Sequence, residues 1–267
     1  MAHVLIFDSG VGGLSVLAEI RKAAPDTRTT LVADNGFFPY GNRTEPELID
    51  RLPGLLAKLY ERHLPDVVVV ACNTASTVAL EEIRSALGVP VVGTVPAVKP
   101  AALKTETGVI GLLGTPGTVE RQYTEELIVD YAPDVHVIRH GSAELVEMAE
   151  QKLRGEQLNF TDLKRVLSKL TNDLRGHEMD TLVLACTHFP LVRDEIAYLL
   201  SPDITIIDSG EAVARRTINR LNLSGASGGH QEGDNIAVFT AEEEGLAALE
   251  PALVAHGIDR VEYCEDY

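Results

Sequence analysis

Two of the chain's three cysteines stand in matching surroundings. Cys72 lies in VVVVACNTAS (Val67–Ser76) and Cys186 in TLVLACTHFP (Thr181–Pro190), so each follows an apolar run and precedes polar residues. In parallel α/β sheets, ligands gather where such strands end and helices begin. A helix N-terminus carries partial positive charge and favours a thiolate over a thiol. We therefore predict that Cys72 and Cys186 share one function, whereas Cys264, with no polar motif around it, is interpreted as a small core residue.

Two thiols that face one cleft suit a reaction in which a proton leaves one face of a carbon and another arrives on the opposite face. One sulfur must begin as a thiolate that takes the proton, and the other as a thiol that gives one. Disulfide exchange also uses two cysteines, but those are usually close in sequence.

Other residues near the predicted strand ends could assist. Asp8 and Ser9 end the first strand before a glycine-rich turn, where Ser9 can offer a hydroxyl to an anion. His188 is interpreted as a hydrogen-bond partner of the Cys186 thiol. A metal site built from Cys72, Cys186, His188 and Asp8 stays open as an alternative, although the usual zinc spacings and H-E-x-x-H are absent. We find no nucleotide-binding fingerprint and no lysine in a pyridoxal phosphate context, so we expect no cofactor and no metal.

The elements that must position these residues alternate along the chain. Short β-branched runs alternate with helical patterns, which indicates an α/β fold with mostly parallel sheets. The predicted strands are Val4–Phe7, Thr29–Ala33, Val67–Ala71, Val89–Gly93, Val109–Leu113, Val135–Ile138, Thr181–Ala185, Ile204–Ile207 and Ile236–Thr240, with a last one near Arg260–Cys264. Predicted helices cover Leu48–Leu59, Leu145–Leu153 and Leu163–Leu174.

A weak internal repeat divides the chain into two halves. A strand followed by DSGVGG opens the first half and a strand followed by GTPGT opens the second, and each half later reaches one of the two cysteine motifs. We therefore predict two similar lobes related by a pseudo-twofold axis, with the active site in the cleft between them. Because sixty residues follow Ile207, we expect the chain to return to the first lobe. The predicted lobes are residues 1–97 plus 208–267, and residues 98–207; the stretch from Asn222 to Asn235 is predicted to be an exposed loop.

Charge and composition limit the class of protein. The formal net charge of −17 argues against nucleic acid as a primary ligand, because phosphate contacts need a basic face. Three cysteines form no disulfide framework, and no stretch is long and apolar enough for a secretory signal or a membrane span. We expect a cytoplasmic protein with reduced thiols and no membrane partner.

These motifs together resemble the glutamate racemase family. The resemblance rests on DSGVGGL (Asp8–Leu14), PYG (Pro39–Gly41), ACNTAS (Ala71–Ser76) and CTHFPL (Cys186–Leu191), in the family's order, with Asp208-Ser209-Gly210 later. It implies a cofactor-independent racemase, usually a homodimer, that interconverts L- and D-glutamate and supplies D-glutamate for peptidoglycan.

The resemblance also implies roles for single residues. Cys72 would handle the α-proton of D-glutamate and Cys186 that of L-glutamate, with Asp8 assisting the first thiol and His188 the second. The residues that would hold the substrate's carboxylates and amine are Asp8, Ser9, Tyr40, Gly41, Asn73, Thr74, Thr187 and His188. We further expect Asn73, Thr74 and Thr187, at two helix starts, to stabilise carbanion-like charge.

One segment departs from the family pattern. Many members carry a G-D-T-A-R type of segment before Pro-Tyr-Gly, where this chain has Ala33–Phe38. This segment affects two inferences from the resemblance, namely which substrate side chain is preferred and how the dimer is arranged. Two further alternatives remain: a racemase of the same superfamily acting on aspartate or another small acid, and a non-catalytic amino-acid-binding module.

Overall fold

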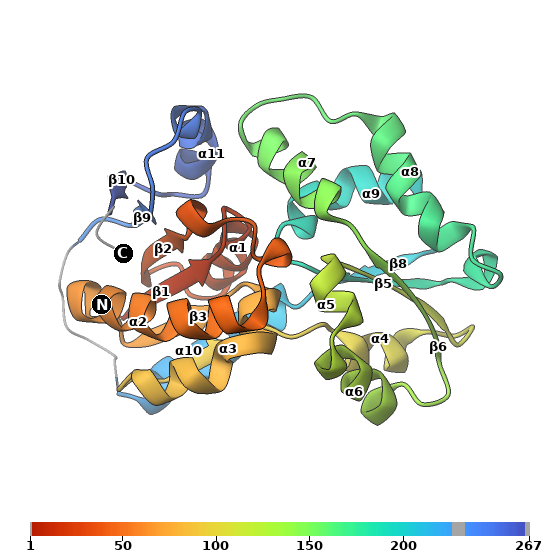
Figure 1. Cartoon of the computed structure of the whole chain (residues 1–267), viewed down its shortest axis with the longest axis horizontal. Coiled ribbons are helices and arrows are strands. Elements are labelled where there is room, and N and C mark those ends of the chain that lie inside the picture. The colour runs from red at the N-terminus through yellow and green to blue at the C-terminus, as the bar shows by residue number, and fades with distance from the viewer. Residues whose placement is uncertain (1, 226–232, 265–267) are drawn as a thin grey trace.

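Buried β-branched runs form two parallel sheets in this computed structural model, which describes residues 2–225 and 233–264. The first sheet has the order β10-β9-β2-β1-β3-β4 and the second β6-β5-β7-β8, and every pairing among the described strands is parallel. The strands of the first sheet are β1 (His3–Asp8), β2 (Arg28–Ala33), β3 (Val67–Val70), β4 (Val91–Gly93), β9 (Ile236–Phe239) and β10 (Arg260–Tyr263). Those of the second are β5 (Val109–Gly114), β6 (His136–Gly141), β7 (Thr181–Ala185) and β8 (Thr205–Ile207). The predicted α/β fold with two lobes is confirmed (Figure 1).

The two sheets share one local topology. In the first, β1 lies between β2 and β3, with β4 beyond β3; in the second, β5 lies between β6 and β7, with β8 beyond β7. The order 2-1-3-4 thus recurs as 6-5-7-8, which is the structural counterpart of the sequence repeat. β9 and β10 return to pair beside β2, although the exact lobe bounds stay a prediction.

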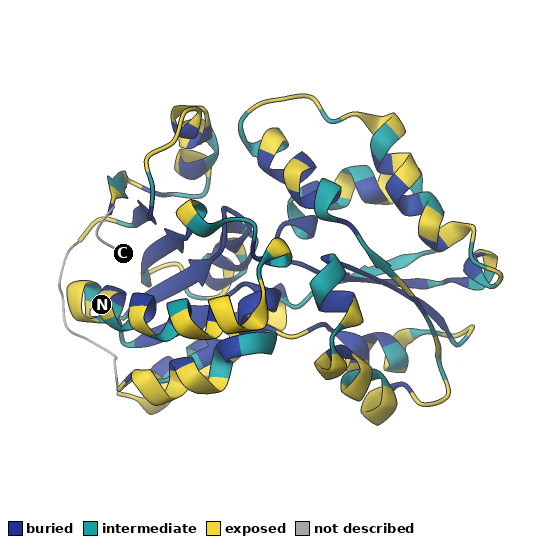
Figure 2. Cartoon of the chain, viewed as in Figure 1, coloured by how far each residue is buried: buried dark blue, intermediate teal, exposed yellow. Residues whose placement is uncertain are grey.

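Helices cover the sheets with their buried faces and leave their other faces exposed to solvent (Figure 2). The α-helices are α1 (Gly13–Ala23), α2 (Glu45–His63), α3 (Asn73–Ala86), α4 (Val98–Lys104), α5 (Pro116–Glu120), α6 (Gln122–Tyr131), α7 (Ala143–Leu153), α8 (Phe160–Thr171), α9 (Arg193–Leu199), α10 (Gly210–Leu223) and α11 (Glu250–Ala255). Short 3₁₀ turns are η1 (Asn35–Phe37), η2 (Tyr40–Asn42), η3 (Gly176–Glu178), η4 (Phe189–Val192) and η5 (Leu246–Leu249). In α2, a leucine stripe at three- and four-residue spacing packs against the first sheet, as its periodicity predicts.

Several predicted bounds were wrong at their ends. β4 begins at Val91, because Pro90 precedes it and contributes no N–H to a ladder, and β6 extends through Gly141. The helix predicted over Leu163–Leu174 is α8, which begins earlier at Phe160, after the Asn159 side chain caps it, and ends at Thr171. The loop predicted from Asn222 begins later, because α10 continues to Leu223; residues 226–232 of that loop lie outside the described part of the chain.

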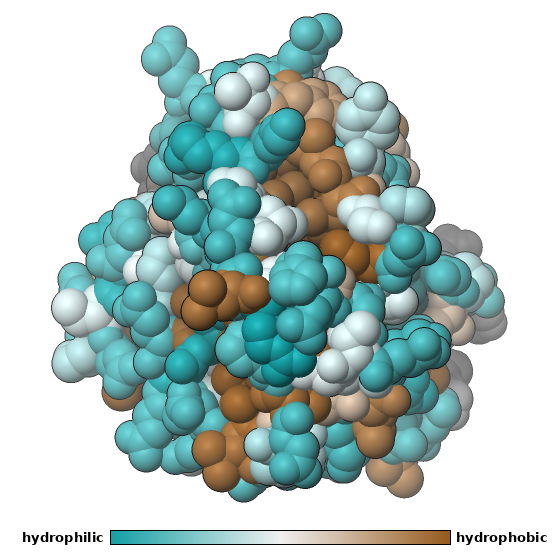
Figure 3. All heavy atoms as spheres, turned by 90° about the vertical axis from the view of Figure 1, so that its right-hand side faces the viewer, coloured by the Kyte–Doolittle hydropathy of each residue, from teal (hydrophilic) through white to brown (hydrophobic). Residues whose placement is uncertain are grey.

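The end of the second lobe carries exposed hydrophobic side chains among polar ones (Figure 3). Leu103, Val129 and Leu174 are the most exposed aliphatic residues of that lobe, with Leu174 at 95% exposure. None of the helices in the described residues is both long enough and apolar enough to cross a bilayer.

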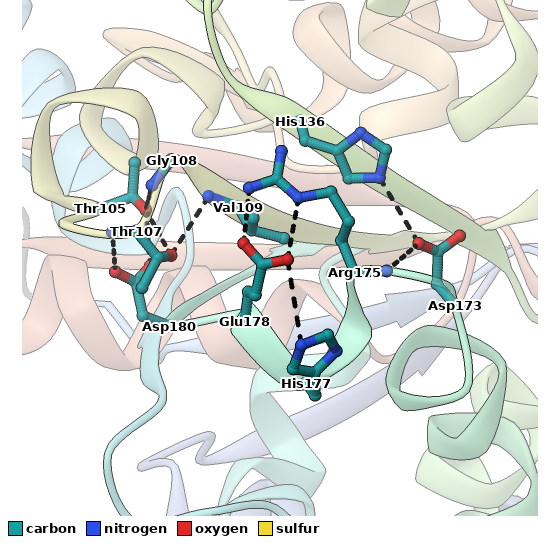
Figure 4. A network of polar contacts seen from close by, with 10 residues as sticks. All are labelled: Thr105, Thr107, Gly108, Val109, His136, Asp173, Arg175, His177, Glu178 and Asp180. Carbon is teal, nitrogen blue, oxygen red and sulfur yellow. Dashed lines mark hydrogen bonds and ion pairs between the residues drawn. The ribbon is translucent and has the colours of Figure 1, made fainter.

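A polar network surrounds the loops at the end of the second sheet where β5, β6 and β7 begin (Figure 4). The Asp180 carboxylate accepts hydrogen bonds from the Thr105 hydroxyl at 2.6 Å and from the backbone N–H groups of Glu106 and Thr107 at 2.7 and 2.9 Å. Arg175 pairs with Glu178, and His136 contacts Asp173. These contacts join the connection before β5 to the one before β7.

Candidate active site

Both cysteines of the repeated motifs line one pocket between the lobes. The pocket contains about 490 Å³ of space between atoms, part of it open to solvent. From the first lobe its lining residues are Ser9, Phe38, Pro39, Tyr40, Gly41, Asn42, Cys72, Asn73 and Thr74. From the second they are Thr115, Pro116, Thr118, Ala143, Val146, Glu147, Cys186, Thr187 and His188. Both thiols are nearly buried, at 6% exposure for Cys72 and 7% for Cys186.

Cys72 caps a helix, as the sequence predicts. It follows β3 and is the N-cap of α3, and its sulfur accepts from the backbone N–H of Ala75 at 3.5 Å. The Ser9 hydroxyl lies 3.8 Å from the same sulfur. The helix-end N–H lowers the pKa of Cys72, as expected, but burial, and then the charge of Asp8, raises that pKa far above its ordinary value. Those two effects outweigh the single N–H, so Cys72 rests as a thiol.

Cys186 differs from Cys72 in the element that follows it. The chain after Cys186 enters the 3₁₀ turn η4, and α9 begins only at Arg193, so the predicted helix start at Thr187 is wrong. In place of a helix end, the sulfur has the imidazole of His188, with Nδ1 at 3.9 Å. The two thiols therefore have different neighbours at equivalent strand ends.

A buried carboxylate holds His188, and the sequence analysis missed it. Oε1 of Glu150, from α7, lies 2.9 Å from Nε2 of His188 and also accepts from the backbone N–H of Val11 at 3.0 Å. Burial disfavours the charged imidazole, but the hydrogen bonds with Cys186 and Glu150 outweigh burial and raise the pKa of His188 well above its ordinary value. Glu150 has a lowered pKa, because the hydrogen bond and charge of His188 overcome the effect of burial. The pair is therefore a carboxylate and an imidazolium.

Asp8 lies behind the pocket and is not one of its lining residues. The carboxylate is fully buried at the end of β1 and accepts from the Thr187 hydroxyl at 3.3 Å. Burial raises the pKa of Asp8, while the charge of His188 acts in the opposite direction. Asp8 thus contacts the Cys186 motif directly and influences Cys72 through its charge.

The predicted substrate-binding residues other than Asp8 all line the pocket, but two of them present different groups than expected. The Tyr40 hydroxyl donates to Asp34 at 2.5 Å, so its proton is not directed at a ligand. Oδ1 of Asn73 is buried and is among the side-chain atoms with no hydrogen-bond partner in the described residues. An unpaired buried acceptor suits an ammonium group better than a carboxylate.

Thr115 and Thr118 are further lining residues that sequence analysis did not select. Their hydroxyls lie 2.9 Å apart, and the Thr74 hydroxyl is 3.4 Å from that of Thr115. The repeat contained the signal, because Thr115 follows β5 as Ser9 follows β1. Hydroxyls from both lobes thus meet in one place. Together they form a cluster of hydrogen-bonding groups that can bind an anion although none of them is a cation.

Within the described residues we find no cluster of three or more histidine, cysteine or acidic side chains arranged to hold a metal ion. The donors around Cys72 and Cys186 are instead hydroxyls, an amide and an imidazolium. Such a site can position a small anionic molecule between two sulfurs.

Known proteins with similar sequences and structures identify the family. The family model described as Asp/Glu/Hydantoin racemase matches residues 12–217. Curated glutamate racemases from Shewanella sp. (strain MR-7) and Sphingopyxis alaskensis are 48% and 43% identical; the alignments cover 92% of both chains in the first case, and 98% of this chain and 97% of the relative in the second.

A solved structure agrees over the whole fold. The Escherichia coli glutamate racemase, described as a complex with L-glutamate and the activator UDP-MurNAc-ala, is 42% identical, with a TM-score of 0.92 over 98% of each chain. The chain therefore belongs to the Asp/Glu/Hydantoin racemase family, as an amino-acid racemase of the glutamate racemase group.

Proposed function

We propose that this enzyme interconverts L- and D-glutamate without a cofactor, with Cys72 and Cys186 as the two acid/base residues. The observation that carries the proposal is that these two cysteines, from equivalent strand ends of the two sheets, line the same pocket. Similarity to glutamate racemases over nearly the whole chain supports glutamate as the substrate.

In the L-to-D direction, the Cys186 thiolate takes the α-proton of L-glutamate and the Cys72 thiol gives a proton to the opposite face. Two features support this direction: burial raises the pKa of the Cys72 thiol, and the imidazole of His188 lies beside the other sulfur. In the reverse direction the roles exchange, so Cys72 must lose its proton after D-glutamate binds. We assign Oδ1 of Asn73 to the substrate ammonium and the hydroxyls of Thr74, Thr115 and Thr118 to a carboxylate.

The cellular role belongs to the same proposal. D-glutamate made by the enzyme would supply peptidoglycan synthesis in the cytoplasm. We also propose a homodimer, supported by the exposed aliphatic side chains at the end of the second lobe; analytical ultracentrifugation showing a monomer at micromolar concentration would remove that part.

The test measures racemisation of both enantiomers in deuterated water. Cys72→Ser and Cys186→Ser are each expected to lower kcat by roughly 10²–10⁴-fold, the usual contribution of a general acid or base. Cys264→Ser is the matched control, because that buried cysteine is not among the pocket's lining residues. Aspartate serves as the competing substrate, and UDP-MurNAc-ala is added in parallel because the E. coli relative is described with it as activator.

Each single variant also retains half of the chemistry. Cys72→Ser keeps the base for L-glutamate and Cys186→Ser the base for D-glutamate, so each should still eliminate a β-leaving group from one enantiomer of a substituted analogue. Racemisation near the wild-type rate in both variants would refute the two-base mechanism. Absence of deuterium at the α-carbon with the wild-type enzyme would refute racemisation itself.

A further inference from the structure

One wall of the active-site pocket is a segment without regular secondary structure. Phe38, Pro39, Tyr40, Gly41 and Asn42 all line the pocket, and this stretch consists of two extended residues, which follow η1, and the 3₁₀ turn η2. Such a segment has no ladder of backbone hydrogen bonds to fix its position. Single backbone hydrogen bonds, such as that from Asn42 N–H to the Pro39 carbonyl, shape its turns, and side-chain contacts tie those turns to the rest of the fold.

A buried carboxylate outside the pocket binds this segment at one end. Asp34 is fully buried, and its two oxygens accept from the Tyr40 hydroxyl at 2.5 Å and from the Arg51 guanidinium at 2.8 and 2.6 Å. Burial, and then the charge and hydrogen bond of Asp34, raises the pKa of Tyr40 well above its ordinary value, so the phenol stays protonated and keeps donating. Tyr40 therefore lines the pocket with its hydroxyl bound to Asp34.

The remaining partner of Asp34 comes from the far end of the chain. Thr240 directly follows β9, and its hydroxyl donates to Oδ1 of Asp34 at 2.7 Å while accepting from the backbone N–H of Gly36 at 3.2 Å. This hydroxyl contacts both the carboxylate of Asp34 and the backbone of η1. A threonine or serine can donate and accept at once, which no apolar isostere can do.

The neighbouring residue adds a second pair of contacts. The Asn35 side chain donates to the carbonyl of Ala241 at 2.8 Å and accepts from the Ala241 N–H at 3.1 Å. A Cβ added at Gly36 would lie 3.2 Å from Cβ of Ala241, so the two stretches are in close contact. Residues 240 and 241 thus hold η1 by hydrogen bonds and by packing.

We propose that Thr240 and Asn35 are positioning residues for racemisation: through Asp34 and Gly36 they fix the Phe38–Asn42 wall against the substrate. Neither residue is among those lining the pocket. The segment that they hold includes the stretch in which this chain departs from the family pattern, so the link between Asn35 and Ala241 is a property of this chain's own residues. The kinetic part of this inference rests on the proposed function.

The main test compares Thr240→Val with Thr240→Ser. Valine keeps the shape and removes both hydrogen bonds, and serine restores them. We expect Thr240→Val to lower kcat/KM for both enantiomers by roughly 10- to 100-fold, because small displacements of substrate-positioning groups cost that much, and Thr240→Ser to recover most of it. Asn35→Ala, at a half-buried site that tolerates truncation, is expected to act in the same direction.

The matched control is Thr217→Val. Thr217 is also fully buried, but its hydroxyl donates within α10 to the Val213 carbonyl, outside the active site. It should keep its kinetics within about twofold, because its hydroxyl lies outside the active site. Its loss of stability should be smaller than that of Thr240→Val, because one neutral hydrogen bond is lost in place of two, one of them to a carboxylate. Equal kinetics for Thr240→Val and Thr217→Val, or failure of serine to rescue, would overturn the proposal.

A substrate-independent readout separates this inference from the proposed function. Amide hydrogen exchange in residues 35–42 should be faster in Thr240→Val than in Thr217→Val, with or without glutamate turnover. Unchanged exchange would overturn the positioning role even if racemisation is demonstrated. Conversely, if exchange is faster in Thr240→Val but the wild-type enzyme does not racemise glutamate, the positioning role of Thr240 is supported and glutamate is rejected as the substrate.

Discussion

At the scale of single residues, the two thiols are made unequal by what surrounds them. Cys72 has a helix N–H, a serine hydroxyl and a nearby carboxylate, and its pKa is raised by burial and by Asp8. Cys186 has an imidazolium that is itself held by Glu150. Equivalent positions in two related sheets thus have different hydrogen-bond partners and charges beside them, which lets one pocket treat mirror-image substrates differently.

Glu150→Gln tests the role of the buried ion pair. The raised pKa of His188 keeps the ring protonated to higher pH, and glutamine removes the anion that contributes to this shift. The pKa of His188 should therefore fall, and the alkaline limb of kcat/KM for L-glutamate should move to lower pH. We expect a loss of roughly tenfold at mildly alkaline pH and less at acidic pH, below the 10²–10⁴-fold contribution of a general acid or base, because the His188 ring itself is retained.

Glu144→Gln, on the same helix, is the control for this variant. Glu144 is only partly buried and pairs with Arg165 at the surface, so its pH profile should match the wild type. A Glu150→Gln profile that superimposes on that of Glu144→Gln would show that the His188–Glu150 contact does not govern the activity.

At the scale of elements, strand ends were predictable and helix starts were less so. Runs such as Val67–Val70 have β-branched residues buried on both faces, and this local signal locates the strand and the residue that follows it. The turn after Cys186 was not predictable in this way. Its polar residues and proline fit both a helix start and the 3₁₀ turn η4 that the structure has.

Gly12→Ala tests the close approach at the start of α1. Gly12 has helical torsion angles, so alanine is allowed by the backbone, but its Cβ would clash with Nδ1 of His188 and would lie 2.7 Å from Oδ2 of Asp8. Displacing either side chain should lower kcat/KM by about 10²-fold, because a misplacement of about 1 Å in an active site can cost that much.

The matched substitution is Gly54→Ala in the middle of α2. Nothing lies within 4 Å of its added Cβ, and the free energy of unfolding should rise by about 1 kcal/mol because alanine favours a helix interior. Its kinetics should be unchanged. Wild-type activity in Gly12→Ala would mean that the turn can move away from His188 without consequence.

At the scale of the whole molecule, the site requires contacts that no local pattern reveals. Glu150 reads in the sequence as one more acid in α7, and only the packing of that helix against the Val11 turn makes it the partner of His188. Thr240 reaches Asp34 because β9 returns beside β2 after the second lobe is complete. The sequence could identify the residues at strand ends, but the residues that support them come from the way the lobes assemble.

Asp180→Asn tests the network that joins the connections at the opposite end of the second sheet. Burial alone would raise the pKa of Asp180, but hydrogen bonds from Thr105, Thr107 and Glu106 overcome it and lower the pKa to about 2. The ionised carboxylate therefore stabilises the fold above the unfolded-state pKa, and this stability is lost as the pH falls toward 2. Asparagine turns an amide donor toward backbone donors, so urea unfolding at pH 7 should show a loss of about 1 kcal/mol for this partly exposed group. The deficit should shrink below about pH 4, where Asp180 becomes protonated in the unfolded wild-type chain.

The control is Asp134→Asn, at an exposed position in the same lobe, which should show no deficit at either pH. A deficit in Asp180→Asn that stays constant from pH 7 to pH 3 would mean that packing, and not the charge, is what this network requires.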